Sequence, residues 1–179
     1  MKYPRKTTNL PLILGAGGTV ILNWWIDASF AVHPNMRGHT GGGLSKGREF
    51  PVVTSTKKKL KTRSSTETYI VGVYDCMPSV CWTWYFLEIQ DYNFTENIVY
   101  QGNQIAILLE NNGKASGSNI TKHINIQFLF STYRINKKEV TVEWCTKNGM
   151  TEYFMTKPLQ GNLFNKFRYL IMGVIPTNK

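Results

Sequence analysis

The chain has 179 residues, of which 42% are hydrophobic, and this is enough apolar material for one domain with a core of ordinary size. That composition excludes intrinsic disorder, and the 15 glycines and seven prolines follow no repeat typical of collagen-like or low-complexity chains. Lys and Arg outnumber Asp and Glu by 21 to 11, which gives a formal net charge of +10. Such an excess favours an anionic partner, nucleic acid before anionic lipid.

The cysteine pattern and the first residues bear on the cellular compartment. Cys76, Cys81 and Cys145 form no C-x-x-C pair and have no histidine at metal-ligand spacing, which predicts a reduced, intracellular protein, cytoplasmic or nuclear. The apolar stretch 10–14 is too short for the core of a signal peptide. Glycines and a proline interrupt the longer run 10–26, so we expect no membrane partner.

The first third of the chain predicts an antiparallel start. Residues 20–28 are β-branched and aromatic, which is typical of a buried strand, and they carry one carboxylate, Asp27, near the end. A turn and a glycine-rich stretch at 39–44 follow, and then a short β-rich run at 50–55. We therefore expect residues 20–55 to form a three-stranded meander with a weak middle strand.

A helix is expected next. Ser64 and Glu67 have the spacing of a capping box, in which each side chain satisfies backbone groups at the start of a helix. Apolar residues then recur every three or four positions from Ile70 to Leu87. Pro78 should kink this helix or split it in two, because proline lacks the N–H that the helical ladder requires.

The second half alternates short strands and helices. We expect a strand at 97–101, a helix at 104–110, a polar loop at 111–118 and a half-exposed strand at 140–144. Residues 123–133 alternate as a strand would, yet they also form a helical face, so the local pattern leaves both structures open. An antiparallel start followed by alternating strands and helices predicts an α/β domain with one mixed sheet covered by helices.

Five stretches, read together, resemble the ribonuclease H region of copia-type LTR retrotransposon polyproteins, in the same order and at similar spacing. They are Trp25-Ile-Asp-Ala-Ser-Phe-Ala-Val-His33, Lys61-Thr-Arg-Ser-Ser-Thr-Glu67, Asn97-Ile-Val-Tyr-Gln-Gly-Asn103, Thr121-Lys-His-Ile-Asn125 and Thr156-Lys-Pro-Leu-Gln-Gly161. The resemblance implies a ribonuclease H-like mixed five-stranded sheet flanked by helices, with 123–133 helical.

Residues 2–14 resemble the end of the reverse transcriptase region that precedes ribonuclease H in those polyproteins. We therefore expect a reverse transcriptase tail or linker at 1–18, the ribonuclease H-like domain at 19–173 and a C-terminal tail at 174–179. This arrangement suggests a fragment or a remnant open reading frame. The rest of the polyprotein, with its reverse transcriptase portion, is then an expected partner.

Enzymes of the family that the chain resembles cut the RNA strand of an RNA–DNA hybrid. They use two Mg²⁺ or Mn²⁺ ions held by carboxylates on the first strand, in the first helix, at the end of the fourth strand and at the start of the last helix. Asp27 matches the first carboxylate, but Tyr69, Gly102 and Tyr153 stand at the other three positions. The resemblance therefore implies a catalytically degenerate domain that binds no metal tightly.

Neighbouring acids offer little compensation. Glu67 lies two positions before Tyr69, a rotation of about 200° on a helix, so it should face away from the site and act in capping. Glu152 would need a one-residue shift to replace Tyr153. The neighbours of Gly102, Gln101 and Asn103, are both neutral.

A basic run precedes the first helix, with five cations and no acid among seven residues: Lys57, Lys58, Lys59, Lys61 and Arg63. Such a run binds phosphates or is only a solvated face. The sequence thus predicts a ribonuclease H-like domain that binds an RNA–DNA hybrid or another nucleic acid without cutting it. An active divalent-metal-dependent endonuclease is the alternative, and a relic without selected activity is the third possibility.

Overall fold

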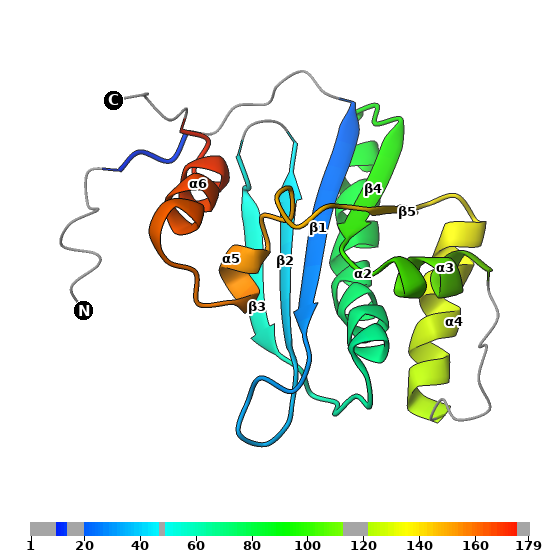
Figure 1. Cartoon of the computed structure of the whole chain (residues 1–179). Coiled ribbons are helices and arrows are strands. Elements are labelled where there is room, and N and C mark those ends of the chain that lie inside the picture. Colours follow the sequence, from blue (N-terminus) through cyan, green and yellow to red (C-terminus); the bar gives the residue numbers. More distant parts are fainter. Residues whose placement is uncertain (1–9, 14–19, 47–48, 113–121, 175–179) are drawn as a thin grey trace.

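A computed structural model describes residues 10–13, 20–46, 49–112 and 122–174. Five strands form one sheet in the order β3-β2-β1-β4-β5, in which β1 pairs antiparallel with β2 and parallel with β4 (Figure 1). Their bounds are β1 Ile21–Ser29, β2 His39–Ser45, β3 Val52–Lys57, β4 Glu96–Gln101 and β5 Thr141–Trp144. The expected meander and the mixed five-stranded sheet are confirmed.

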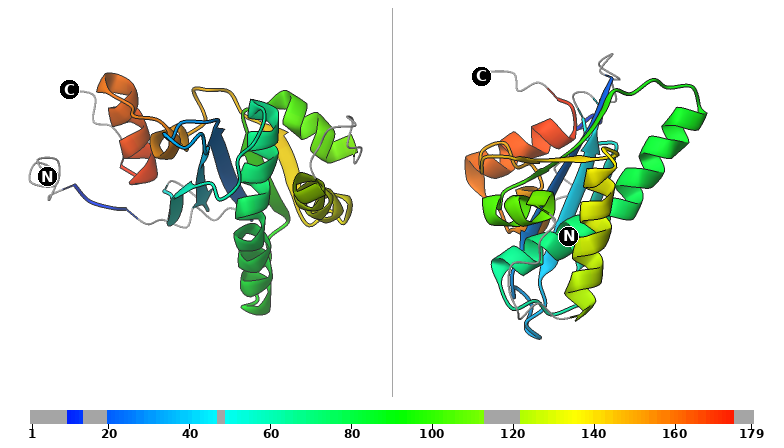
Figure 2. Two further views of the ribbon diagram at one scale, coloured as in Figure 1. Left: turned by 90° about the horizontal axis from the view of Figure 1, so that it is seen from below. Right: turned by 90° about the vertical axis from the view of Figure 1, so that its right-hand side faces the viewer.

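Helices cover both faces of the sheet. They are α2 Ser65–Ile89, α3 Gln104–Asn112, α4 Lys122–Asn136, α5 Tyr153–Thr156 and α6 Gly161–Ile171. Figures 1 and 2 show α2 and α4 on one side and α5 and α6 on the other. The short helix α3 contacts α2, α4 and the edge strand β5. The expected last helix is in fact two elements, a single turn that begins at Tyr153 and a longer helix after it. No helix within the described residues is long and apolar enough to cross a membrane.

The two-residue period of β1 separates the core from the other face. Leu22, Trp24 and Ile26 are buried in the main core beside Val73 and Met77 of α2. Asp27 therefore belongs to the opposite face of the strand, toward α5. This alternation leaves the carboxylate outside the apolar core.

Close packing of α5 explains the glycine-rich middle strand. A Cβ atom at Gly41 would lie 2.8 Å from Cγ2 of Thr156, and one at Gly43 would collide with the carboxyl group of Glu152. Both contacts are closer than real Cβ atoms tolerate. The absence of a side chain at these positions lets α5 approach the sheet beside Asp27, the register partner of Gly41.

The start of α2 is capped as expected. The Ser64 hydroxyl accepts a hydrogen bond from the Glu67 amide at 3.1 Å, and the Glu67 carboxylate accepts one from the Arg63 amide at 2.7 Å. Pro78 does not split the helix, since α2 is assigned as one element of 25 residues with Pro78 inside it. Its ring is exposed, where the lost backbone bond can be replaced by water.

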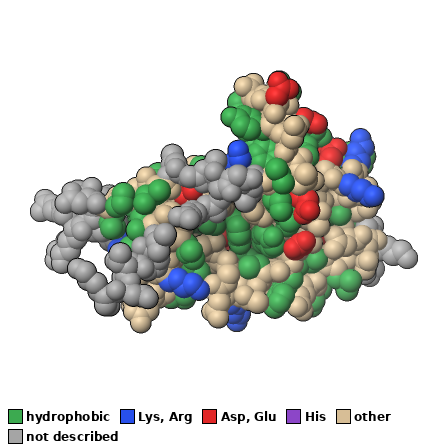
Figure 3. Space-filling model, turned by 90° about the horizontal axis from the view of Figure 1, so that it is seen from above, with side chains coloured by type: hydrophobic (Ala, Val, Ile, Leu, Met, Phe, Trp, Pro, Cys, Tyr) green, Lys and Arg blue, Asp and Glu red, His purple; other side chains and the backbone are tan. Residues whose placement is uncertain are grey.

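Two further features concern the helices. Residues 123–133, ambiguous by pattern, belong to α4, as the resemblance implies. The last turns of α2 project beyond the sheet, and Figure 3 shows hydrophobic and acidic side chains on this projection. Its exposed side chains include Trp82, Phe86 and Ile89.

The domain boundaries expected at 1–18 and 174–179 fall almost wholly outside the described residues.

A buried polar pair joins the end of β4 to α3. The Nε2 group of Gln101 donates a hydrogen bond of 2.6 Å to Oε2 of Glu110, and both residues are fully buried. Within the described part of the chain, Oε1 of Glu110 has no hydrogen-bond partner. Burial raises the pKa of Glu110 to about 8, with a smaller opposing effect of the bond from Gln101. The carboxyl group therefore stays protonated through neutral pH.

This pair predicts a pH-dependent stability. Because the folded pKa exceeds the ordinary value of 4.5, the stability linked to Glu110 is complete below pH 4.5 and is lost as the pH rises toward 8. Glu110→Gln should leave the free energy of unfolding nearly unchanged at pH 5 and raise it by about 2–4 kcal/mol at pH 8.5. Urea unfolding at both pH values measures this, with the exposed Glu88→Gln as the matched control. An equal effect of Glu110→Gln at the two pH values would contradict the assignment.

Candidate functional site

Asp27 is the centre of the site. Its side chain, 0% exposed, lies near the carboxyl end of β1 and accepts a hydrogen bond of 2.8 Å from the hydroxyl of Tyr69 in α2. The hydroxyl of Thr156 donates to its other oxygen, and Nζ of Lys157 lies 3.2 Å from that same oxygen. Two separate segments, the start of α2 and the end of α5, thus supply the partners of one buried carboxylate.

Gly102 and Tyr153 complete the set of positions that the resemblance singled out. Ile26 of β1 is paired with Gln101, the last residue of the parallel strand β4. Gly102 follows directly, at the level of Asp27. A Cβ atom at Gly102 would lie 3.7 Å from the Tyr69 hydroxyl oxygen and 3.9 Å from that of Tyr153. The structure therefore brings Asp27, Tyr69, Gly102 and Tyr153 together around one point.

Lys157 supplies the positive charge of the site. Its Nζ lies 3.2 Å from the ring centroid of Tyr153, a cation–π arrangement, as well as 3.2 Å from Oδ2 of Asp27. Burial, followed by the nearby Asp27 carboxylate, raises the pKa of both tyrosines, so both hydroxyls are neutral at physiological pH. One carboxylate, one ammonium and neutral hydroxyls then make up the polar groups around the centre.

These groups do not fit a pair of divalent cations. Two such ions bring four positive charges into one pocket and require several converging oxygen anions. The one carboxylate is already bonded to two hydroxyls and an ammonium, and neutral tyrosines are poor replacements. In the described ranges, no group of three or more His, Cys, Asp or Glu side chains could hold a metal ion.

The two neighbouring acids lie elsewhere. Glu67 is engaged in capping α2 through the Arg63 amide. Glu152 is buried, and its Oε1 points at Gly43, which pairs with Trp25 rather than with Asp27. Burial raises the pKa of Glu152 well above its usual range, which disfavours a charged carboxylate at this position.

The basic run divides into one buried and four exposed residues. Lys58 is 2% exposed, and its Nζ donates to the Thr40 hydroxyl at 2.6 Å and lies 3.6 Å from the Asp75 carboxylate. Burial lowers its pKa to about 8 against the opposing effect of Asp75. This lysine, included in the basic run by sequence, is therefore a structural residue of the interior and offers no surface for phosphate.

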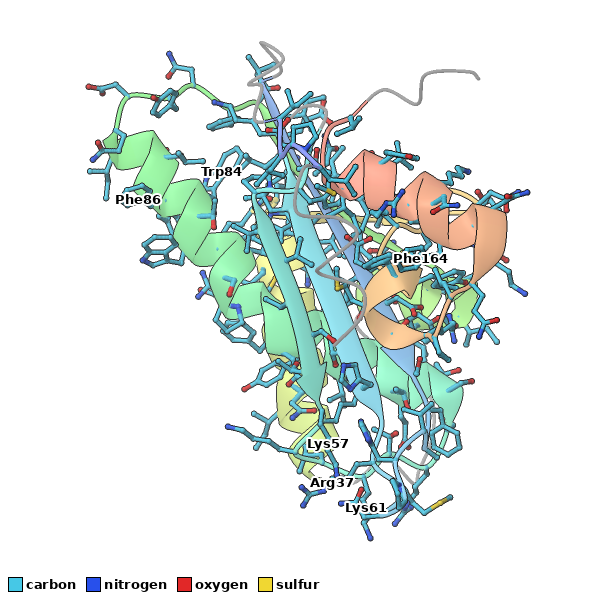
Figure 4. All side chains as sticks on the ribbon, turned by 90° about the vertical axis from the view of Figure 1, so that its left-hand side faces the viewer. Arg37, Lys57, Lys61, Trp84, Phe86 and Phe164 are labelled. Atoms are coloured by element: carbon cyan, nitrogen blue, oxygen red, sulfur yellow. The ribbon has the colours of Figure 1, made fainter. Side chains whose placement is uncertain are left out.

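The exposed cations gather at one end of the molecule. The Lys58 amide bonds to the Gly38 carbonyl at 3.0 Å, which joins the loop before α2 to the β1–β2 turn that carries Arg37. Figure 4 shows Arg37, Lys57 and Lys61 together at this end. We define the cationic end by its residues Arg37, Lys57, Lys59, Lys61 and Arg63. Sequence reasoning missed Arg37, because only strand pairing brings the turn against the basic run.

An open groove of about 450 Å³ adjoins the site. It shares Tyr69 and Gly102 with the group around Asp27, and the rest of its lining comes from the starts of α2 and α3 and the end of β5: Ser65, Asn103, Gln104, Ile105 and Trp144. No sequence signal marks these residues as neighbours. The groove forms because two helices begin, and β5 ends, at the same edge of the sheet.

Comparison with known proteins identifies the fold. No protein-family model and no curated protein sequence matches the chain. The N-terminal ribonuclease H domain of a Mycobacterium tuberculosis protein superposes with a TM-score of 0.52 at 8% identity, covering 82% of this chain and 96% of that one. LC11-RNase H1, isolated from compost by a metagenomic approach, gives 0.50 at 7% identity, covering 72% and 86%.

A third solved structure, a foamy viral protease-reverse transcriptase in complex with double-stranded DNA, gives a TM-score of 0.49 at 12% identity and covers 81% of this chain and 94% of that one. The first two likenesses, together with the strand order and the helices on both faces, show that the chain has a ribonuclease H-like fold. At these identities the likeness concerns the fold alone.

The bonding of Asp27 yields a stability test. In a site with four carboxylates and no metal, removing one acid relieves repulsion between like charges. Here Asp27→Ala leaves two hydroxyls and the Lys157 ammonium without their acceptor, so it should lower the free energy of unfolding by about 2–4 kcal/mol. Tyr69→Phe, which removes a single donor, should cost about 1 kcal/mol. Urea unfolding at pH 7 in EDTA measures both, and an unchanged or more stable Asp27→Ala would contradict this account of the site.

Proposed function

We propose that this chain is a non-catalytic ribonuclease H-like domain of a copia-type retrotransposon polyprotein, which binds RNA–DNA hybrid or other nucleic acid. The proposal rests on one observation above the others: the protein's own hydroxyls and ammonium occupy Asp27, the single acid at the centre of the site. Hydrolysis by two metal ions requires free carboxylate oxygens at this place. The chain offers a charge-balanced pair there instead.

Four of the five copia-like stretches border this site, which supports the family assignment. One contains Asp27, one leads into the helix of Tyr69, one ends around Gly102 and one begins with Thr156 and Lys157. Stretches that were recognised separately in the sequence therefore converge in space. Under this proposal residues 1–18 are the end of a reverse transcriptase region, and the protein acts inside the cell.

The cationic end is the proposed contact for phosphates. It presents lysines and arginines from the end of β3, from the loop that follows and from the β1–β2 turn, and no acid interrupts the run from Lys57 to Arg63. Phosphate contacts of this kind contribute most of the affinity for nucleic acid but carry no base information. We therefore expect binding that depends steeply on salt and little on sequence.

Charge removal at this end tests the binding surface. Lys57→Gln with Lys59→Gln should weaken binding to a 12-bp hybrid and lower the slope of log Kd against log salt by about 1–2. Lys58 stays intact because it is buried. The exposed pair Lys137→Gln with Lys138→Gln, beyond α4, is the control with the same loss of charge. Anisotropy titrations at several salt concentrations measure the slopes. Equal effects of the two double variants would show that the cationic end is a solvated face that does not bind phosphates.

Restoring the carboxylates tests the loss of catalysis. The parent protein should not cleave an RNA–DNA hybrid in Mg²⁺ or Mn²⁺, and Mn²⁺ should not raise its melting temperature. A combined variant with Tyr69→Glu, Gly102→Asp, Tyr153→Asp and Lys157→Met should cleave in Mn²⁺, because three acids would again converge on Asp27 and the competing ammonium is gone. Space exists at Gly102, where the nearest atom to an added Cβ lies at 3.7 Å.

The controls separate misfolding from failure of the site. Each single restoration should remain inactive. The variant with three new carboxylates that retains Lys157 should cleave less than the variant with all four substitutions. Melting curves with and without Mn²⁺ report binding, since a ligand of the folded state raises the midpoint. Cleavage by the parent that disappears in Asp27→Asn would favour an active endonuclease instead. A folded fourfold variant that binds no Mn²⁺ would overturn the alignment of the carboxylates.

A further inference from the structure

The groove beside Asp27 has the chemistry of a site for a flat, neutral group. Its volume of about 450 Å³ falls within the range of small-ligand sites, roughly 300–1,000 Å³. None of its seven lining residues is charged. A phosphate or a metal ion would find no opposite charge in the groove itself, whereas an uncharged ring with polar edges would find apolar walls and amide and hydroxyl groups.

Trp144 forms the aromatic wall. It is the last residue of β5 and lies on the same side of that strand as Val142, which is buried in the main core. Trp144 lies level with the first residues of the two covering helices, Ser65 of α2 and Gln104 of α3, so neither helix covers its side chain. Trp144 is therefore 50% exposed and open to a ligand.

The other walls offer hydrogen-bonding groups. Oδ1 of Asn103 accepts a hydrogen bond of 3.0 Å from the Ala106 amide, so the side-chain NH₂ is the group that Asn103 can offer to a ligand. The Tyr69 hydroxyl donates to Asp27, which leaves its oxygen able to accept. Donors and acceptors without charge suit the edge of a nucleobase, and the apolar faces of Ile105 and Trp144 suit its plane.

The groove is continuous with the cationic end. The basic run ends at Arg63, Ser64 caps α2, and Ser65 already lines the groove. A nucleic acid whose phosphates lie along the cationic end therefore passes the groove within two residues of Arg63. Charged tracks flanked by aromatic rings bind single strands, because every unpaired base has a face that can stack. A base held in a duplex would first have to be flipped out of its stack.

From this combination we infer that the groove binds an unpaired nucleobase of a single-stranded segment, stacked on Trp144, with the adjoining phosphates on the cationic end. The inference rests on the proposed nucleic-acid function and adds the kind of ligand that the altered site takes. The neutral hydroxyls of Tyr69 and Tyr153 beside Gly102 are consistent with it, because a base needs no metal and would be poorly served by clustered carboxylates.

Trp144→Ala separates base stacking from phosphate binding. In anisotropy titrations at fixed salt, this variant should raise the Kd for labelled 12-nucleotide single strands, RNA and DNA alike, by about tenfold. Its Kd for a blunt 12-bp hybrid should stay within about twofold of the parent. Trp144→Phe should restore most of the single-strand affinity because a ring is again present. Trp82→Ala is the matched control, since Trp82 is 64% exposed on the α2 projection and does not line the groove.

Tryptophan fluorescence gives a second readout that does not depend on removing the large side chain. Single strands should quench the emission of the parent and of Trp82→Phe, and quench Trp144→Phe much less. The inference is overturned if Trp144→Ala binds single strands as the parent does, or if it weakens hybrid binding equally. In either case the loss of affinity in the Lys57→Gln, Lys59→Gln variant would still support the proposed function. Failure of every nucleic acid to bind at low salt would overturn both.

Discussion

The ion pair between Asp27 and Lys157 is the interaction on which the arrangement of the site depends. A fully buried carboxylate is stable only when charge and hydrogen bonds compensate its lost hydration. Here an ammonium, a tyrosine and a threonine do so, and they come from the start of α2 and from the segment around α5. The bonds of Asp27 to Lys157, Thr156 and Tyr69 together therefore tie both helical layers to the carboxyl end of β1.

The same interaction belongs to a site that several segments of the fold bring together. Parallel pairing of β1 with β4 places Asp27 beside Gly102, and the close approach of α5 to the glycines of β2 places Tyr153 opposite them. Four carboxylates at these positions would repel one another until metal ions arrived. Neutral hydroxyls and one internal cation remove that requirement, so the site is compact without any ion. The ribonuclease H-like fold therefore does not by itself establish the chemistry of this site.

Charge is distributed unevenly over the described residues around the site. Most cations of the basic run lie on the surface at one end, while Lys58 is drawn inside to pair with Asp75 and hydrogen-bond Thr40. The groove next to this end carries no charge and one exposed indole ring. Phosphates and bases would meet different parts of the surface, and the two contributions to binding can therefore be separated by substitution.

The sequence by itself determined the elements whose signals are local. The capping box at Ser64, the β-branched run of β1 and the alternation of β5 each depend on neighbours a few residues away, and the resemblance placed Asp27, Tyr69, Gly102 and Tyr153 at equivalent positions. Residues 123–133 remained undecided by pattern because both periodicities fit them. Packing decided in favour of a helix, because the helix α4 buries Phe128 against α2 and α3.

Tertiary structure alone decided where individual side chains lie. The burial of Lys58, the contact of Arg37's turn with the basic run, the bonds of Thr156 and Lys157 to Asp27 and the groove at Trp144 all join segments far apart in the chain. Strand register and helix packing set these contacts, and a sequence pattern records only spacing along the chain. The sequence pattern predicts that a lysine in a basic run is exposed, and only the folded structure shows that Lys58 has a buried acceptor.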